Sequence, residues 1–401
     1  SPTARIPHRA RDREPPATVS TRSSGSGRQP ITAGDSVGGD LGFITPERFD
    51  RHQAERLESP RGGLLVVSCH SGAYMATKVL EKYQRRLNQS GSSGRVRHLR
   101  DVDFQFSDSE TCVRLDTDVS GSDVFLFQAL YAPASGRSVD QNHMAFLAAA
   151  RALREWGANY VTGVVPYLAY ARQDKPTKFQ REPTTAQLMA DLAIDAGISR
   201  VVTWHPHASQ IRGFYGGVPV DALDPLPLFV EAFSRFEDRD DVIVVAPDAG
   251  ASKLVTYFGR ALNLQCSIAS KFRPSREVAV ITEIIGDFSG KRTAIVLDDM
   301  ISSGGTLEAV IRKVCEEKGI VNVHIGVSHN LCREVALERL AHLRKAFSLR
   351  QVTVTNSVPQ TDAFAALPYA SVRCLSDTLA RVVNRIRYNR AVSALPESPS
   401  P

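Results

Sequence analysis

Two adjacent carboxylates and the loop after them are the residues best suited to chemistry. Asp298 and Asp299 follow a short aliphatic run, and the loop consists of Ser302, Ser303, Gly304, Gly305 and Thr306. Glycines let a backbone approach a phosphate, and a helix N-terminus attracts the anion with its free N–H groups. Carboxylates repel phosphate, but they accept hydrogen bonds from sugar hydroxyls or bind a divalent cation. The pattern predicts a site for ribose 5-phosphate; the alternative is an ordinary acidic turn before a helix.

Alternating apolar runs and amphipathic segments indicate the elements that position this loop. We expect a buried strand at 294–297, directly before the carboxylates, and a helix from Leu307. The same alternation recurs along the chain and predicts an α/β fold with mainly parallel sheets flanked by helices. Asp221–Pro227 contains two prolines and is the expected junction between two similar halves. Further strands are expected at 64–68, 96–106, 124–129, 160–167, 200–204, 242–246, 265–269, 279–282, 323–327 and 352–355, and helices at 73–87, 142–156, 185–196, 253–262 and 379–388.

Composition excludes several classes of protein. The 401 residues are 42% hydrophobic and 23% charged, with a formal net charge of +6. No apolar run approaches the roughly 20 residues that a membrane helix needs. No basic stripe interleaved with aromatic residues indicates nucleic-acid binding. The six cysteines stand far apart without a C-x-x-C pair, so neither a zinc site nor a disulfide framework is indicated, and a reducing, cytoplasmic location is expected.

Both ends of the chain have the composition of disordered segments. Residues 1–41 are rich in Ser, Arg, Gly and Pro and form an expected disordered basic tail, and 391–401 form a second disordered tail. The first segment has no apolar core of a secretory signal. It is either an inert tail or the remnant of an organelle transit peptide.

Several segments occur in the order found in ribose-phosphate diphosphokinases, which have a type I phosphoribosyltransferase fold. The segment Leu297–Thr306 resembles the ribose-phosphate motif, and Pro166–Lys175 resembles the ATP-binding segment of that family. The remaining similar segments are Phe106–Glu110, Val202–Phe214, Pro247–Gly250, Lys271–Arg273 and Thr355–Gln360. The last of these is a late landmark without an assigned role. The resemblance extends from about Gly62 to about Tyr388.

This resemblance implies a fold and a reaction. It implies two tandem phosphoribosyltransferase-like domains, at 62–225 and 226–368, followed by a C-terminal helix at 369–390. The implied enzyme transfers the diphosphoryl group of ATP to ribose 5-phosphate with Mg²⁺, giving 5-phosphoribosyl 1-diphosphate and AMP. Members of the family form dimers that assemble into homohexamers. The sugar phosphate is expected on Ser302–Thr306, with its hydroxyls on Asp298 and Asp299.

The expected ATP site combines two segments that make chemical sense unaided. Arg172 can fork onto phosphate oxygens or stack under a base, while Gln173 and Asp174 offer neutral and anionic acceptors. Phe106 can cover one face of adenine, with Asp108 and Glu110 accepting from its amino group. The alternatives are a solvated turn for the first segment, and a core Phe beside solvated acids for the second.

The expected catalytic groups are Lys271, Arg273 and His207. Lys271 and Arg273 are spaced by two, so an extended backbone turns both to one side, where they can stabilise the charge of a transferring diphosphoryl group. A solvated charged hairpin is the alternative. His207 can bind a magnesium-bound nucleotide, directly or through water, although a lone histidine is often structural. Asp248 follows a strand and is the second expected metal ligand.

Departures from the family pattern leave a second function open. His205 and Gly216 stand where the family usually has aspartates in its metal surroundings, Ser302 replaces a frequent Asp, and Ala251 replaces a frequent Gly. A non-catalytic paralogue that assembles with an active diphosphokinase and regulates it is therefore the alternative function. A plain phosphoribosyltransferase would not explain Tyr170–Lys175.

Overall fold

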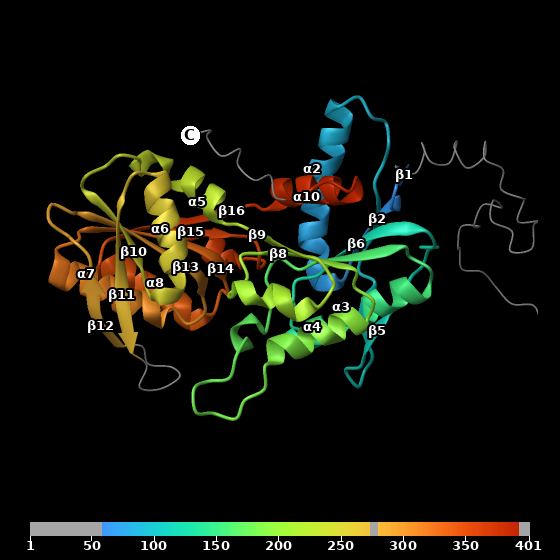
Figure 1. The fold of residues 1–401 in the computed structure, drawn as a ribbon, viewed down its shortest axis with the longest axis horizontal. Coiled ribbons are helices and arrows are strands. Elements are labelled where there is room, and N and C mark those ends of the chain that lie inside the picture. Colours follow the sequence, from blue (N-terminus) through green and yellow to red (C-terminus); the bar gives the residue numbers. More distant parts are fainter. Residues whose placement is uncertain (1–57, 273–279, 393–401) are drawn as a thin grey trace, which may run out of the picture. The chain divides into compact units, whose positions relative to one another are not determined.

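Two seven-stranded sheets organise the described part of the chain, residues 58–272 and 280–392 of a computed structural model (Figure 1). These residues all fall within one unit of mutual contacts. The predicted tails at 1–41 and 391–401 lie outside the described residues, apart from Ala391 and Val392.

The first sheet has the strand order β1-β2-β6-β7-β8-β9, with β3 beside β2. All neighbouring pairs are parallel except β1–β2. The strands β4 and β5, which lie between β3 and β6 in the sequence, form a separate antiparallel hairpin. The elements of this half are β1 (Glu58–Ser59), β2 (Gly62–Ser68), η1 (His70–Gly72), α2 (Ala73–Gln89), β3 (Arg97–Leu99), β4 (Asp103–Gln105), β5 (Thr111–Val113), β6 (Ser122–Phe127), α3 (Val139–Glu155), β7 (Tyr160–Val164), η2 (Ala171–Gln173), α4 (Thr185–Asp195), β8 (Arg200–Trp204), η3 (Ser209–Tyr215) and β9 (Val220–Leu223).

The second sheet has the order β12-β11-β10-β13-β14-β15-β16 and is parallel except for its β11–β12 edge. Its predicted alternation of strands and helices is confirmed by this order. The elements are α5 (Leu226–Phe233), η4 (Ser234–Phe236), β10 (Val242–Ala246), η5 (Ala249–Ala251), α6 (Ser252–Ala261), β11 (Gln265–Phe272), β12 (Val280–Ile285), β13 (Thr293–Ile301), α7 (Gly305–Lys318), β14 (Asn322–Asn330), α8 (Glu334–Ala346), β15 (Leu349–Thr355), α9 (Asp362–Ala365), β16 (Ala370–Arg373) and α10 (Ser376–Arg387).

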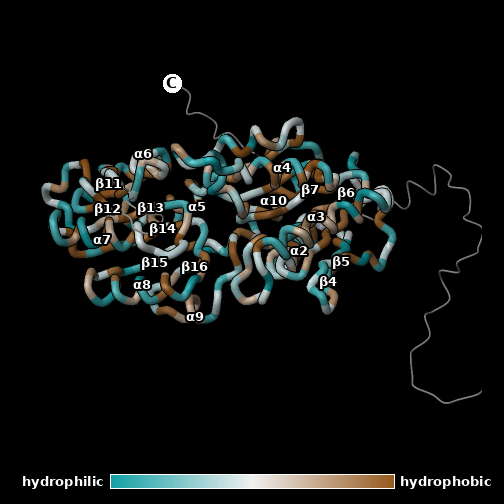
Figure 2. Tube along the Cα trace, turned by 90° about the horizontal axis from the view of Figure 1, so that it is seen from below, coloured by the Kyte–Doolittle hydropathy of each residue, from teal (hydrophilic) through white to brown (hydrophobic). Residues whose placement is uncertain are grey.

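Helices cover both faces of each sheet, because the central strands are apolar on both sides. Alternate residues of β2 and β6 pack against α3 and α4 on one face of the first sheet, and against α2 and α10 on the other. In the second sheet, α7 and α8 cover one face, and α5 and α6 cover the other. Figure 2 shows hydrophobic residues gathered along the strands, with hydrophilic ones in the connections. Burial of both faces explains the continuous aliphatic runs in the sequence.

The last helix returns to the first sheet after its chain has completed the second. β16 pairs with β15 in the second sheet, and α10 then packs against α2. Arg86 on α2 donates two hydrogen bonds to one oxygen of Asp377 on α10, at 3.0 and 2.6 Å. The segment predicted as a C-terminal helix at 369–390 therefore includes a strand before the helix begins.

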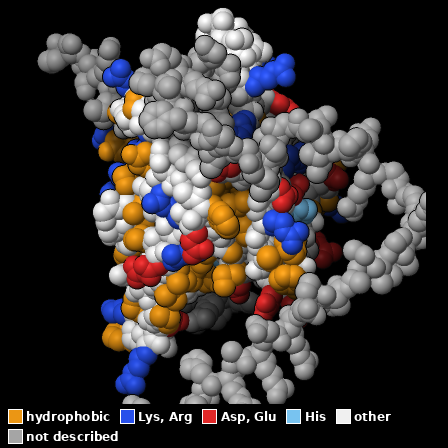
Figure 3. Space-filling model, turned by 90° about the vertical axis from the view of Figure 1, so that its right-hand side faces the viewer, with side chains coloured by type: hydrophobic (Ala, Val, Ile, Leu, Met, Phe, Trp, Pro, Cys, Tyr) orange, Lys and Arg blue, Asp and Glu red, His pale blue; other side chains and the backbone are white. Residues whose placement is uncertain are grey.

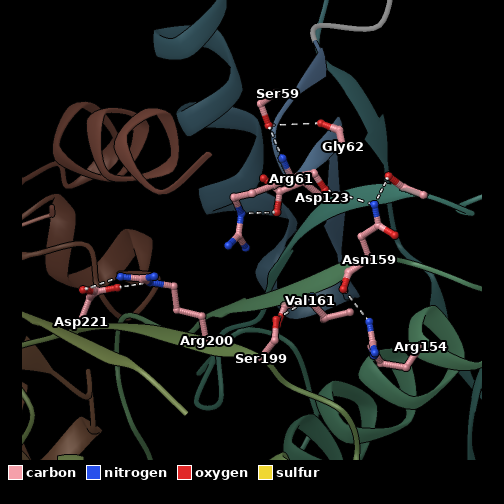
Figure 4. A network of polar contacts seen from close by, with 11 residues as sticks. Ser59, Arg61, Gly62, Asp123, Arg154, Asn159, Val161, Ser199, Arg200 and Asp221 are labelled. Atoms are coloured by element: carbon pink, nitrogen blue, oxygen red, sulfur yellow. Dashed lines mark hydrogen bonds and ion pairs between the residues drawn. The ribbon is translucent and has the colours of Figure 1, made fainter. Parts of the chain in front are cut away.

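Polar contacts tie the amino-terminal edge of the first sheet together, away from the carboxyl ends of the strands (Figure 4). Arg61, in the turn between β1 and β2, donates from Nε to Asp123 Oδ1 on β6 at 3.1 Å. Arg200 on β8 donates from Nε to Asp221 on β9 at 2.6 Å. The first bond joins residues 62 positions apart in sequence, and the second joins two neighbouring strands of the sheet.

Two predicted strands differ from the structure, and one covering helix was not predicted. The strand expected at 96–106 is split into β3 and β4, and Asp101 between them has a positive φ of 52°. The strand expected to end at 297 continues to Ile301, so both carboxylates lie within β13. The sequence also left α8 unassigned, although it covers the second sheet. Among the described helices, none is both long and apolar enough to cross a membrane.

Candidate active site

The predicted site residues of both halves follow the carboxyl ends of parallel strands. Arg172 lies after β7 and His207 after β8, while Asp248 follows β10 and the Asp pair lies near the carboxyl end of β13. Open parallel sheets present such ends in a common crevice. The first sheet thus carries residues predicted to bind ATP, and the second carries those predicted to bind the sugar phosphate.

The loop predicted to bind the sugar phosphate, Ser302–Thr306, turns sharply from β13 into α7 and is called the sugar-phosphate loop below. Gly304 has a φ of +78°, a left-handed conformation that glycine adopts without strain, and Gly305 begins the helix. Arg339 on α8 donates from Nη1 to the Ser303 carbonyl at 2.7 Å, and its Nε pairs with Glu308 Oε2 at 3.1 Å. Arg339 therefore fixes the loop from behind, a role with no signal in the sequence.

The two carboxylates of β13 have opposite protonation behaviour. Burial raises the pKa of Asp298 well above its ordinary value, and the charges of Asp299 and Asp248 raise it further. Burial also raises the pKa of Asp299, but the hydrogen bond and charge of His207 outweigh it and hold that pKa at about 2. Asp299 is therefore ionised at neutral pH, whereas Asp298 needs a hydroxyl donor or a cation nearby to carry its charge.

A direct contact joins the two halves at the centre of this site. His207 Nδ1 lies 2.5 Å from Asp299 Oδ2, although the residues are 92 positions apart in sequence. The hydrogen bond that His207 donates to Asp299 raises the pKa of His207 above its ordinary value, against the opposing effect of burial. A carboxylate that holds one imidazole nitrogen orients the ring and leaves Nε2 to face a ligand.

The segment predicted to bind ATP lies beside residues 205–210 after β8, which we call the histidine turn because they include His205 and His207. Gln210 Nε2 donates to Asp174 Oδ2, and the charges of Asp174 and Arg172 both act on His207. Tyr170 has a positive φ of 65° and donates from its hydroxyl to Asp140, which helps to raise its pKa to about 12. Arg172 and Gln173 are exposed at the mouth of this turn.

The β4–β5 hairpin presents the predicted adenine-binding residues at its tip. Phe106 is 51% exposed, and its N–H donates to the Glu110 carbonyl at 2.9 Å. Asp108 Oδ1 accepts from the Glu110 N–H at 3.1 Å, so this carboxylate closes the turn. Asp103 holds the base of the hairpin by accepting from the His70 N–H at 2.6 Å and from Arg137. The exposed Phe106 ring is consequently carried on an anchored support.

The predicted basic loop lies only partly within the described residues. Lys271 is on β11, three residues past Ile268, which pairs with the last residue of β10. The backbone therefore places Lys271 at the same sheet edge as Asp248. The prediction for Arg273 lies outside the described residues.

Comparisons with known proteins agree with this geometry. Residues 64–197 match the family model of the N-terminal domain of ribose phosphate pyrophosphokinase. The ribose-phosphate pyrophosphokinase of Caldanaerobacter subterraneus subsp. tengcongensis is 36% identical over 290 residues, which cover 72% of this chain and 87% of that protein. The chain belongs to the ribose-phosphate pyrophosphokinase family. The Chromobacterium violaceum ribose-phosphate pyrophosphokinase is also 36% identical, over 73% of this chain and 85% of its own length.

A solved structure supports the same family. The phosphoribosylpyrophosphate synthetase of Mycobacterium smegmatis matches with a TM-score of 0.70 and 29% identity, over 81% of this chain and 99% of that one. The predicted fold class, two tandem phosphoribosyltransferase-like α/β halves, is confirmed, as is the prediction of a ribose-phosphate pyrophosphokinase enzyme. None of the comparisons favours a non-catalytic partner protein.

The sequence prediction overlooked residues at the end of β14. His329 and Ser328 are 1% and 0% exposed and contact the histidine turn of the other half. They follow the aliphatic run at 323–327, so the rule that polar residues after a parallel strand reach the site edge could have found them.

Proposed function

We propose that this chain transfers the diphosphoryl group of ATP to the anomeric hydroxyl of ribose 5-phosphate, giving 5-phosphoribosyl 1-diphosphate and AMP. The observation that carries the proposal is the contact between His207 and Asp299. In this contact, the turn that we expect to face the nucleotide meets the carboxylate that we expect to bind the sugar, and the two come from different halves. A reaction between two phosphorylated substrates needs such an arrangement, because its rate depends on orienting one against the other.

In this proposal, ribose 5-phosphate docks with its phosphate on Ser302, Ser303, Gly304, Gly305 and Thr306. Asp298 and Asp299 accept hydrogen bonds from its two ring hydroxyls. Such a donor would offset the cost of a buried charge on Asp298. The anomeric hydroxyl then attacks the β-phosphorus in line, the bond from that phosphorus to the α-phosphate oxygen breaks, and AMP leaves with that oxygen. The attacking oxygen gives up its proton to water during the transfer.

ATP would lie over the Arg172 segment with Phe106 against its base. Arg172, Gln173 and Asp174 contact the nucleotide, and Asp108 and Glu110 lie near the adenine amino group. His207, Lys271 and Arg273 stabilise the charge that spreads over the transferring phosphoryl oxygens. Little covalent chemistry falls to the protein, so positioning and charge carry the rate.

The carboxylates of the site suit Mg²⁺, which prefers oxygen ligands and keeps substrate phosphates and water among them. The described residues hold no group of three or more His, Cys, Asp or Glu side chains that could cage a metal. Asp248 and His207 are the residues we propose to contact a nucleotide-bound Mg²⁺, directly or through water. When bound, the ion would neutralise phosphate charge.

We further propose a cytoplasmic homo-oligomer, built from dimers and reaching a hexamer. Large apolar side chains are exposed on the first half, among them Met144, Trp156, Leu188 and Leu192. Figure 3 shows hydrophobic side chains spread between charged ones on the face it presents. A hairpin with an exposed Phe106 at its tip is suited to reach the nucleotide site of a neighbouring subunit.

The test is the formation of AMP from ATP by the purified chain, with dependence on both ribose 5-phosphate and magnesium. We expect AMP and 5-phosphoribosyl 1-diphosphate in equal amounts. Binding of both substrates without AMP formation would instead identify a regulatory paralogue. Diphosphate release from 5-phosphoribosyl 1-diphosphate with a base, and no use of ATP, would identify a plain phosphoribosyltransferase.

A further inference from the structure

A fully buried imidazole bridges the two halves directly behind the proposed site. His329, at the end of β14, is 1% exposed. Its Nε2 lies 3.0 Å from the His205 carbonyl oxygen, and its Nδ1 lies 2.8 Å from Ser357 Oγ. A carbonyl oxygen can only accept, so Nε2 carries the proton and donates. This leaves Nδ1 of the neutral ring as an acceptor beside the Ser357 hydroxyl, whose other acceptor is the Ser328 carbonyl at 3.1 Å. Both nitrogens are thus used for structure.

The partner of this imidazole is a strained turn. His205 has a φ of +40°, an uncommon conformation for a residue with a side chain, and it lies two residues before His207. Its own Nδ1 contacts Ser328 Oγ at 2.6 Å. Residues persist in such conformations only where their surroundings determine them. Here the determining groups, Ser328 and His329, come from the other half of the chain.

The segment Thr355–Gln360 anchors the bridge to both halves. Thr355 Oγ1 donates to the Ser328 carbonyl at 2.7 Å, and Ser357 contacts His329. The hydroxyl of Tyr74, at the start of α2, donates to the Asn356 carbonyl at 2.8 Å. This segment is a late landmark of the sequence with no role in the proposed chemistry, and its contacts indicate that it is a structural hub.

We propose that His329 is a positioning residue, which clamps the backbone of the histidine turn so that His207 meets Asp299 across the two halves. The role of the clamp in catalysis rests on the function proposed above, whereas its role in geometry does not. His205, which replaces an aspartate of the family pattern, then belongs to the clamp through the contact of its Nδ1 with Ser328.

The proposal separates rate from affinity. Each substrate is expected to be held mainly by its own half, so loosening the clamp should misalign bound substrates without weakening either one. We expect His329→Ala to lower kcat by about 10- to 100-fold, since a misplacement of about 1 Å can cost that much. The KM values for ATP and ribose 5-phosphate should each stay within about 3-fold of the wild type.

Conservative variants test which nitrogen matters. His329→Gln can place an amide N–H near the position of Nε2 and keep the bond to His205, so kcat should recover to within about 3-fold. His329→Asn can reach only toward Ser357 and should behave like His329→Ala. These two variants keep a polar side chain, and they provide the comparison if the alanine variant does not fold.

His324→Ala is the matched control. His324 is also a buried imidazole on β14, 8% exposed, but it lies near the opposite end of the strand against Phe236. It should lower the thermal midpoint about as much as His329→Ala while leaving kcat near the wild-type value. An equal loss of kcat in His324→Ala, or a glutamine variant no better than asparagine, would overturn the proposal.

A second measurement does not depend on activity. In thermal unfolding of the full chain, His207→Ala should lower the midpoint, because it removes the contact with Asp299. This decrease should shrink by about half or more in the His329→Ala background and stay unchanged in the His324→Ala background. Additive decreases in both backgrounds would refute the clamp. Absence of AMP formation by the wild type would refute only the proposed function.

Discussion

At the scale of single residues, the two neighbouring carboxylates of β13 differ in how readily they ionise. Asp299 is held ionised at a pKa of about 2 by His207, whereas the pKa of Asp298 is raised by burial and by two neighbouring acids. The sequence could identify this pair from its position before a glycine-rich loop. It could not separate the two residues, because the distinction depends on a histidine 92 positions away.

The burial of Asp298 predicts a conflict between stability and activity. Asp298→Asn removes a buried carboxyl group whose ionisation burial opposes, so we expect a higher thermal midpoint at neutral pH together with a loss of kcat/KM for ribose 5-phosphate of about 10- to 100-fold, the range for a hydrogen bond to a charged group. Calorimetric unfolding and steady-state kinetics measure the two effects. Asp238→Asn, at an exposed turn, is the control. A lower midpoint for Asp298→Asn would contradict the assigned cost of burial.

Lys271 is the second prediction at this scale. We expect Lys271→Ala to lower kcat by an amount equivalent to about 2 to 4 kcal/mol of barrier, the range for a lost transition-state donor. Single-turnover measurement of AMP formation checks it. Lys78→Ala, at an exposed position of α2, controls for the loss of a positive charge. A wild-type rate in Lys271→Ala would remove this residue from the mechanism.

At the scale of elements, most of the architecture could be predicted because its strands are buried on both faces. The runs at 64–68, 242–246 and 323–327 all form strands of parallel sheets. The elements that the sequence did not predict are either short or rich in charged residues that obscure their apolar pattern. β5 has only three residues, and α8 buries Ala336, Leu340 and Leu343 among many charged positions. The support of the sugar-phosphate loop by α8 was therefore not foreseeable.

That support yields a prediction for Arg339. Arg339→Ala removes the donor to the Ser303 carbonyl, so the loop should lose its fixed conformation. We expect the KM for ribose 5-phosphate to rise by about 10-fold, equivalent to roughly 1.4 kcal/mol, with the KM for ATP unchanged. Arg344→Ala is the matched control, because Arg344 lies on the same helix and donates instead to the Leu349 carbonyl at 2.7 Å. Equal effects of the two variants would exclude a specific role.

The junction of α2 and α10 predicts a dependence on pH. Burial raises the pKa of Asp377, but the hydrogen bonds and charges of Arg86 and Arg381 outweigh it and lower the pKa below its ordinary value. The pair therefore contributes stability above the unfolded-state pKa of about 3.9, and this contribution is lost as the pH falls through the lower folded-state value. Because both side chains are more than 40% exposed, its size should stay below about 1 kcal/mol.

Thermal unfolding of wild type and Asp377→Asn between pH 3 and pH 7 measures this contribution. The two midpoints should differ at pH 6 to 7 and converge toward pH 3. Asp362→Asn, on α9 away from the junction, should show no such convergence. A difference that grows as the pH falls would mean that the pair does not stabilise the junction.

At the scale of the whole molecule, the decisive contacts join residues from different halves. The sequence indicated two similar halves and a boundary near Asp221–Pro227, and the structure places the end of β9 at Leu223 and the start of α5 at Leu226. Contacts such as His205–Ser328 and Arg86–Asp377 have no local signature, because they join residues more than a hundred positions apart that only the completed fold brings together. The predicted residue limits of the domains remain predictions.

The proposed oligomer predicts recovery of activity by mixing. If Phe106 serves the site of a neighbouring subunit, Phe106→Ala and Lys271→Ala chains damage different parts of a shared site. Subunit exchange between equal amounts of the two inactive proteins should then restore about a quarter of the wild-type activity in a dimer. Mixing Lys271→Ala with Asp299→Asn should restore none, because both lesions lie in the same half. No recovery in the first mixture would place the hairpin over its own subunit's site.

The return of α10 to the first sheet has a consequence for biosynthesis. Leu379, Val383 and Ile386 of this helix complete the apolar layer against α2 and β2, although α10 is the last described helix in the sequence and β2 is among the first strands. During translation, β2 therefore acquires this outer cover only after α10 has been made. Until then the nascent first half exposes an apolar surface, and we expect chaperones to bind it during translation.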